Sequence, residues 1–95
     1  MKKILTATIL FFMLFSARAQ VLHTVNGGNF YYSPQSLTIN VGDTVSWIND
    51  GGFHNVNFDI NTISGLSFSN PESFLSTPTN DVDMYSHVFT IAGTY

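Results

Sequence analysis

The sequence predicts an all-β fold for most of this 95-residue chain. After residue 20, apolar and polar residues alternate with a period of two, the pattern of strands that bury one face. No run in the same region has apolar residues at helical spacing over the length of a helix. Clusters rich in glycine, asparagine and proline separate the alternating runs and are typical of turns. These three observations favour a single small β domain.

The first nineteen residues are predicted to be a signal peptide that precedes this domain. Lys2 and Lys3 stand before an apolar run at residues 4–15, and Ala17 and Ala19 are the small residues of a cleavage site. As a helix this run spans about 18 Å, whereas the hydrocarbon core of a membrane is about 30 Å thick. We therefore expect export to the periplasm or the cell exterior, no membrane span after signal removal, and a mature domain of residues 20–95.

The alternating runs predict short strands at residues 21–25, 30–32, 36–41, 44–47, 54–58 and 85–91. The turn-forming cluster Asn26-Gly27-Gly28-Asn29 separates the first two. Gly42-Asp43 separates the third from the fourth, and it fits either a two-residue hairpin or a corner leading to a facing sheet. A β domain of two facing sheets is the architecture that such a series of short strands predicts.

Residues 61–83 are predicted to form a long loop, because serine, threonine, asparagine and proline dominate them. Phe68, Phe74 and Leu75 are expected to attach this loop to the core. A two-sheet sandwich usually takes about 100 residues and seven or more strands. The predicted strands are fewer, so we expect the domain at residues 20–95 to be C-terminally incomplete.

Charge separates the two parts of the chain and excludes one class of partner. All three basic residues lie within the first eighteen positions, and all six acidic residues lie after them. A nucleic-acid surface depends on lysine and arginine, so nucleic acid is excluded as a partner of the mature domain. Any partner steered by charge is expected to be basic or metallic.

Several motifs together carry a family resemblance. They are Phe30 with Ser33-Pro34, Leu37-Thr38-Ile39-Asn40-Val41-Gly42-Asp43-Thr44-Val45-Ser46-Trp47, Asn49, Gly51, His54-Asn55-Val56, Phe58-Asp59, Val88-Phe89-Thr90 and Gly93-Thr94-Tyr95. This set resembles the plastocyanin and azurin type of cupredoxin, the blue type 1 copper family. The resemblance implies a cupredoxin-like Greek-key β-sandwich without its last strands. It also implies an electron carrier with a redox partner protein, and not an enzyme.

The resemblance implies that His54 is the first copper ligand. It further implies that a cysteine, a second histidine and usually a methionine follow on one loop that begins just after Tyr95. Thiolate and imidazole ligands in a trigonal arrangement suit both copper oxidation states. Asn55 would tie the two ligand-bearing loops together through hydrogen bonds without binding the metal. The chain has no cysteine, and Met84 precedes the expected loop, so these 95 residues alone are not expected to form a blue copper site.

The other histidines have plainer interpretations. His87 is predicted to lie on the same strand face as Tyr85, Phe89 and Ile91, as a core histidine with a hydrogen-bonded ring nitrogen. His23 is assigned no role, and nothing in the spacing of the three histidines favours a zinc or type 2 copper site. Two alternatives to an electron carrier stay open. One is an exported β-sandwich used for adhesion or binding without metal, and the other is a domain of a larger copper oxidoreductase.

Overall fold

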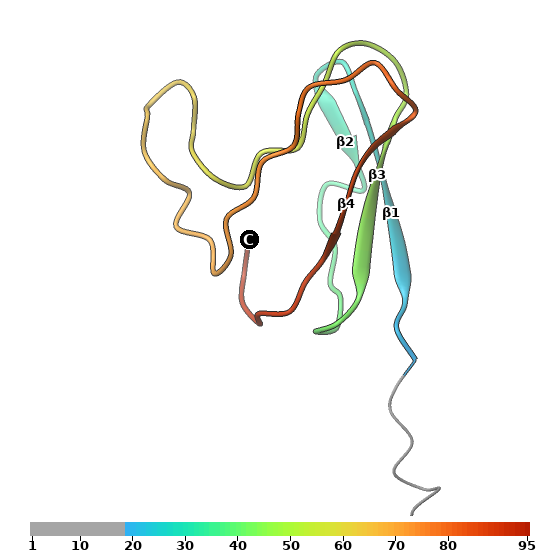
Figure 1. Cartoon of the computed structure of the whole chain (residues 1–95), viewed down its shortest axis with the longest axis vertical. Coiled ribbons are helices and arrows are strands. Elements are labelled where there is room, and N and C mark those ends of the chain that lie inside the picture. Colours follow the sequence, from blue (N-terminus) through green and yellow to red (C-terminus); the bar gives the residue numbers. More distant parts are fainter. Residues whose placement is uncertain (1–18) are drawn as a thin grey trace, which may run out of the picture.

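The computed structural model describes residues 19–95 and shows one mixed β-sheet (Figure 1). Its strands are β1 (Leu22–Gly28), β2 (Tyr31–Ser33), β3 (Thr44–Asn49) and β4 (Asp83–Val88), in the order β2-β1-β3-β4. β1 pairs antiparallel with β2 and parallel with β3, and β3 pairs antiparallel with β4. No helix occurs within residues 19–95, so none there could cross a membrane. The all-β prediction is confirmed, whereas almost all of the predicted signal peptide lies outside the described residues.

β3 is the central strand, and its alternation produced the most accurate prediction. Val45, Trp47 and Asn49 are buried on one face, while the residues between them are half-buried on the other. β1 covers one edge of β3 from Leu22 to Gly27, and β4 covers the other edge. A strand paired on both edges has every backbone group of its ladder satisfied, so its pattern of side chains is enough to define it.

The first predicted turn is shifted along the chain. Asn26, Gly27 and Gly28 belong to β1, and the turn lies at Asn29 and Phe30 instead. Phe30 has a positive φ of 65°, a conformation normally taken by glycine. The glycines extend the strand because each lets a tyrosine ring lie across it. A Cβ on Gly28 would stand 2.5 Å from the Tyr31 ring.

Two predicted strands are wrong in the structure. Residues 36–41 form no strand, because they have no partner strand among residues 19–95. Residues 54–58 form only isolated bridges, His54 with Thr79 and Asn57 with Leu75. The side chain of Asn57 bonds the backbone of its own loop there, which competes with a regular ladder. Since no strand before Gly42-Asp43 pairs with β3 across it, the hairpin interpretation of that corner is excluded.

β4 begins earlier and ends earlier than predicted. A bulge lies opposite Trp47 and Ile48, where Tyr85 and Asp83 are their partners and Met84 is the extra residue. Met84 is therefore buried with the core, while Ile91 is exposed beyond the strand. After Val88, Phe89 exchanges two backbone hydrogen bonds with the corner at residues 42–43, and the chain then turns away from the sheet.

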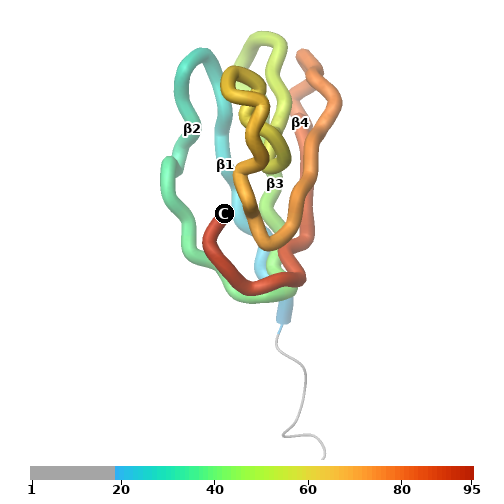
Figure 2. The backbone as a smooth tube through the Cα atoms, turned by 90° about the vertical axis from the view of Figure 1, so that its left-hand side faces the viewer, coloured from blue at the N-terminus to red at the C-terminus, as the bar shows by residue number. Residues whose placement is uncertain are grey.

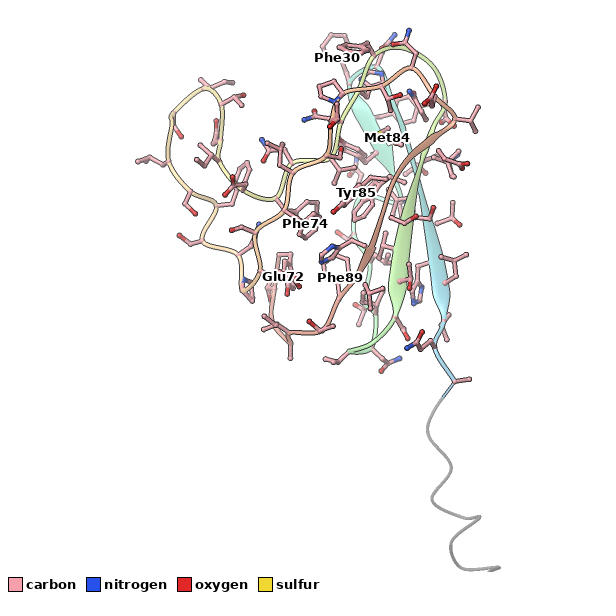
Figure 3. All side chains as sticks on the ribbon, viewed as in Figure 1. Phe30, Glu72, Phe74, Met84, Tyr85 and Phe89 are labelled. Atoms are coloured by element: carbon pink, nitrogen blue, oxygen red, sulfur yellow. The ribbon has the colours of Figure 1, made fainter. Side chains whose placement is uncertain are left out.

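The core lies between the sheet and the long connection that covers one of its faces (Figure 2). Its buried members are Val25, Val45, Trp47, Val56, Phe74, Met84 and Phe89. Phe74, Tyr85 and Phe89 gather in the space between β4 and the connection (Figure 3). Phe74 alone anchors the connection as predicted, because Phe68 and Leu75 are exposed.

An open groove of about 690 Å³ interrupts this second layer. Residues 34–41 form one of its walls and residues 91–95 the other, while Val45, Trp47 and Val56 belong to the core beneath. Leu37 and Val41 are exposed along it. The face of the sheet is therefore covered by the connection on the side of Phe74 and open on the side of residues 34–41.

Candidate functional site

His54 lies in the loop that follows β3, at the end of the molecule where this loop meets the residues before β4. Its backbone N–H donates to the carbonyl of Thr79 at 3.1 Å, and the Thr79 N–H donates back to the His54 carbonyl at 2.9 Å. This two-way bridge holds the histidine backbone against a segment 25 positions later in the chain. The side chain is half-buried.

A hydrogen bond to the backbone determines which ring nitrogen of His54 is available. Nε2 lies 2.8 Å from the carbonyl oxygen of Gly51. A carbonyl can only accept, so Nε2 carries the proton in this contact and Nδ1 of the neutral ring keeps its lone pair. Metal-binding histidines commonly show this arrangement, in which one nitrogen donates to a carbonyl and the other binds the metal.

The loop before His54 passes so close to the imidazole ring that position 52 requires a glycine. Gly51 and Gly52 have φ values of 149° and 96°, and at 96° a residue with a side chain is strained. A Cβ on Gly52 would lie 2.8 Å from His54 Nε2 and 3.1 Å from Asn29 Oδ1. The ring therefore rests directly on the backbone of its own turn.

Asn49 ends β3 beneath this turn, and its side chain is buried. The carboxamide bonds Gly51, Gly52 and Thr79, which are all neighbours of His54 in the loop or across the bridge. Asn49 belongs to the family motif, but the sequence alone predicts no role for it. The available signal was an asparagine at a strand end directly before Asp50-Gly51-Gly52, where an asparagine side chain caps a turn.

Asn55 contacts the later part of the chain, although not a ligand loop. Its Nδ2 is 3.4 Å from the carbonyl oxygen of Ser76, and the next residue, Val56, donates its N–H to Ser76 Oγ at 2.7 Å. Tyr32 donates its hydroxyl to the Asn55 carbonyl at 3.3 Å. The predicted role of Asn55 between two ligand loops stays a prediction.

The other two histidines lie apart from His54 in separate pairs. His87 stacks on Phe74 with ring centroids 3.9 Å apart, as expected of a core histidine. Its Nε2 is 3.2 Å from Glu72 Oε1 but has no hydrogen-bond partner, so the predicted hydrogen-bonded ring nitrogen is wrong for this atom. Ring stacking fixes its orientation instead.

His23 has a partner that sequence reasoning missed. Its Nε2 lies 2.9 Å from Oδ2 of Asp43, a carboxylate that also accepts the backbone N–H groups of Val21 and Asn40. The hydrogen bond with His23, followed by the one from Asn40, lowers the pKa of Asp43 from 3.8 to about 2. This cluster joins the start of β1 to the start of β3.

Asp50 forms a second polar cluster next to the His54 loop. It accepts hydrogen bonds from the Tyr31 hydroxyl and from Asn26 Nδ2. The bond from Tyr31, and then that from Asn26, lowers the pKa of Asp50, and the same contact raises the pKa of Tyr31. The loop before His54 is thus held to β1 and to the start of β2.

The side-chain donors of the described residues supply one ligand of a metal site but not a complete set of ligands. Residues 19–95 contain no group of three or more histidine, cysteine, aspartate or glutamate side chains placed to hold a metal. The chain has no cysteine, and a single imidazole does not hold copper in the trigonal geometry of a blue site. The described residues alone therefore do not fit type 1 copper, although Nδ1 of His54 fits one of its ligands.

Comparisons with known proteins find copper-binding relatives of this chain. A family model described as copper binding proteins of the plastocyanin/azurin family matches residues 19–95. A plastocyanin from Scenedesmus fuscus is 38% identical over 74 residues, which cover 74% of this chain and 72% of that protein. Chloroplastic plastocyanins from Oryza sativa subsp. indica and Hordeum vulgare are each 35% identical, over 80% and 84% of this chain. The matches span about half of these two relatives, at 50% and 53%. No solved structure matches the chain significantly.

Proposed function

Since the chain belongs to the plastocyanin/azurin family of copper-binding proteins, we propose that it serves one-electron transfer and that His54 is a ligand of its type 1 copper. The family membership confirms the cupredoxin resemblance, and with it the prediction of an electron carrier rather than an enzyme. Type 1 copper is the metal that this family implies. We further propose that His54 binds this copper and that the copper carries one electron at a time.

The Nε2 contact of His54 with the Gly51 carbonyl is the observation that carries the proposal. It commits one ring nitrogen to the protein and leaves Nδ1 as the donor for a metal. When bound, copper supplies the change of oxidation state. The residues of this chain hold the imidazole in one orientation through the Gly51 carbonyl and the Thr79 bridge.

In this proposal the remaining ligands, including the cysteine, come from residues beyond Tyr95. The open groove supports it, because residues 34–41 and 91–95 leave room on the core for further chain. The Scenedesmus fuscus relative also supports it, because the match leaves 28% of that protein uncovered. The domain at residues 20–95 is then the N-terminal portion of the sandwich.

Export and a redox partner belong to the same proposal. The signal-like segment at residues 1–19 supports export to the periplasm or the cell exterior. Six acidic residues and no lysine or arginine follow that segment. The partner protein therefore presents a basic surface, since opposite charges steer association.

Copper titration of the natural protein carrying its whole chain tests the proposal. We expect Cu(II) to produce the intense thiolate-to-copper absorption of a blue site. His54→Ala abolishes that absorption, whereas His87→Phe, which keeps a ring against Phe74, retains it. A natural chain that develops no such band, or a His54→Ala variant that keeps it, contradicts the assignment. The 95-residue chain alone is expected to give no band.

A further inference from the structure

We infer that Asn49 is the positioning residue that sets the orientation and the tautomer of the His54 imidazole. This inference rests on the proposed function, since it concerns how the ligand is prepared for the metal. Asn49 does not touch the ring. It acts through the Gly51 carbonyl and through Thr79, the two contacts that hold the histidine.

The buried carboxamide of Asn49 makes three hydrogen bonds. Its Oδ1 accepts the N–H of Gly51 at 2.9 Å. Its Nδ2 donates to the carbonyl of Gly52 at 2.9 Å and to the carbonyl of Thr79 at 3.2 Å. Because two carbonyls lie on one side and an N–H on the other, these partners admit only one orientation of the amide.

These bonds fix the peptide groups on both sides of the Gly51 carbonyl. The N–H of Gly51 and the carbonyl of Gly52 are both held by one side chain. The intervening Gly51 carbonyl therefore has little freedom to turn away from His54 Nε2, 2.8 Å distant. Without that constraint, two consecutive glycines with unusual φ values would have many other conformations available.

Thr79 provides the second connection. Its carbonyl accepts from Asn49 Nδ2 and from the backbone N–H of His54, so one oxygen joins the positioning residue to the ligand residue. Asn49 itself is anchored in the sheet. It is opposite Gly27 in the register of β1 with β3, and its N–H donates to the Val82 carbonyl at 2.8 Å. A rigid strand end thus supports the loop, as a preorganised metal ligand requires.

Asn57 offers a matched control within the same chain. Its Oδ1 accepts an N–H two residues later, from Asp59, and its Nδ2 donates to a carbonyl three residues later, that of Ile60. Asn49 has the same two bonds to Gly51 and Gly52. Asn57 makes neither of the contacts that hold His54, so its substitution removes the same kind of turn without touching the ligand.

The test is ¹⁵N NMR of the apo natural protein at a pH where histidine is neutral, which reports the tautomer of each ring. We expect His54 to be almost entirely in the Nε2–H form. Asn49→Ala is expected to lower the ratio of the Nε2–H to the Nδ1–H form by about tenfold, the effect of losing one positioned hydrogen bond. Asn57→Ala is expected to leave the ratio unchanged. Near-ultraviolet circular dichroism checks that each variant is folded.

Asn49→Asp is the second variant, because it keeps the acceptor for the Gly51 N–H and loses both donated bonds. A folded Asn49→Asp variant is expected to shift the tautomer ratio in the same direction as Asn49→Ala. A wild-type His54 in the Nδ1–H form overturns the inference, even if both variants unfold. So does a folded Asn49 variant with an unchanged ratio. This readout needs no copper, so it stands or fails independently of whether the protein forms a blue site.

Discussion

Gly52 is the residue whose substitution isolates the contact between the loop and the imidazole. An alanine there combines a strained φ of 96° with a Cβ 2.8 Å from His54 Nε2. We expect Gly52→Ala to lower the free energy of unfolding by about 1–3 kcal/mol, the usual cost of such strain, and to displace the ring. Urea unfolding measures the first effect and the His54 NMR signals measure the second.

Gly65→Ala is the control for this prediction. Gly65 also has a positive φ, 73°, but a Cβ there would meet no atom within 4 Å. It should therefore show the strain alone and leave the His54 signals in place. Equal losses of stability in the two variants, with unmoved His54 signals in both, would show that the close approach at Gly52 has no consequence.

Asp43 is one residue whose ionisation makes the stability of the fold depend on pH in acid. Its pKa is lowered in the folded protein, so its ionised form stabilises the fold. That contribution is complete above the ordinary aspartate pKa of 3.8, and it is lost as the pH falls through about 2. Asp43→Asn should lower stability at neutral pH and flatten the fall of stability between pH 4 and pH 2. Urea unfolding from pH 7 to pH 2 measures both.

Asp81→Asn serves as the comparison, since Asp81 is exposed and its backbone, not its carboxylate, bonds Thr79. Asp81→Asn should leave the fall of stability between pH 4 and pH 2 as steep as in the wild type. If the stability of Asp43→Asn also falls as steeply between pH 4 and pH 2, then another carboxylate is responsible for that fall.

At the scale of the elements, the sequence predicts a strand well where the strand has partners on both sides. β3 shows this clearly, because its alternation follows directly from a buried and a half-buried face. Residues 36–41 alternate as strictly, but a strand also needs a neighbouring backbone, which no pattern of side chains reveals. At residues 54–58 the predicted ladder is reduced to separate backbone hydrogen bonds with residues 74–79, while the Asn57 side chain forms hydrogen bonds within its own loop. The Met84 bulge shifts β4 in a way that periodicity alone does not show.

The candidate site also has a part that the sequence predicts and a part that it does not. The His-Asn-Val motif singled out His54 only together with the Gly-Asp-Thr-Val-x-Trp motif before it, because the residue types and their order carry the resemblance. The role of Asn49 depends on Thr79, thirty positions away, and the partner of His23 is twenty positions away. Contacts of this kind depend on the course of the chain in three dimensions. The sequence motifs therefore predicted His54 as a ligand but could not identify the residues that hold its side chain.

For the whole molecule, the groove and the unpaired segment beside it are one feature. The backbone of residues 35–39 has no hydrogen-bond partner among the described residues, although these residues alternate as a strand does. The groove reaches the core next to them. An unpaired extended segment beside an open apolar groove is a usual place for another strand to be added. In our proposal, the chain beyond Tyr95 supplies a backbone partner for residues 35–39 and covers the apolar surface of the groove.

Hydrogen exchange tests this view of the molecule. In the 95-residue chain, the amides of residues 35–39 should exchange almost as fast as in an unfolded chain, while those of Val45–Ile48 in β3 stay protected. The open groove should also bind an apolar dye and promote association of copies. In the natural protein with its whole chain, the amides of 35–39 should become protected and dye binding should disappear. A 95-residue chain that is a monomer with protected amides at 35–39 would mean that its own residues already close the sandwich.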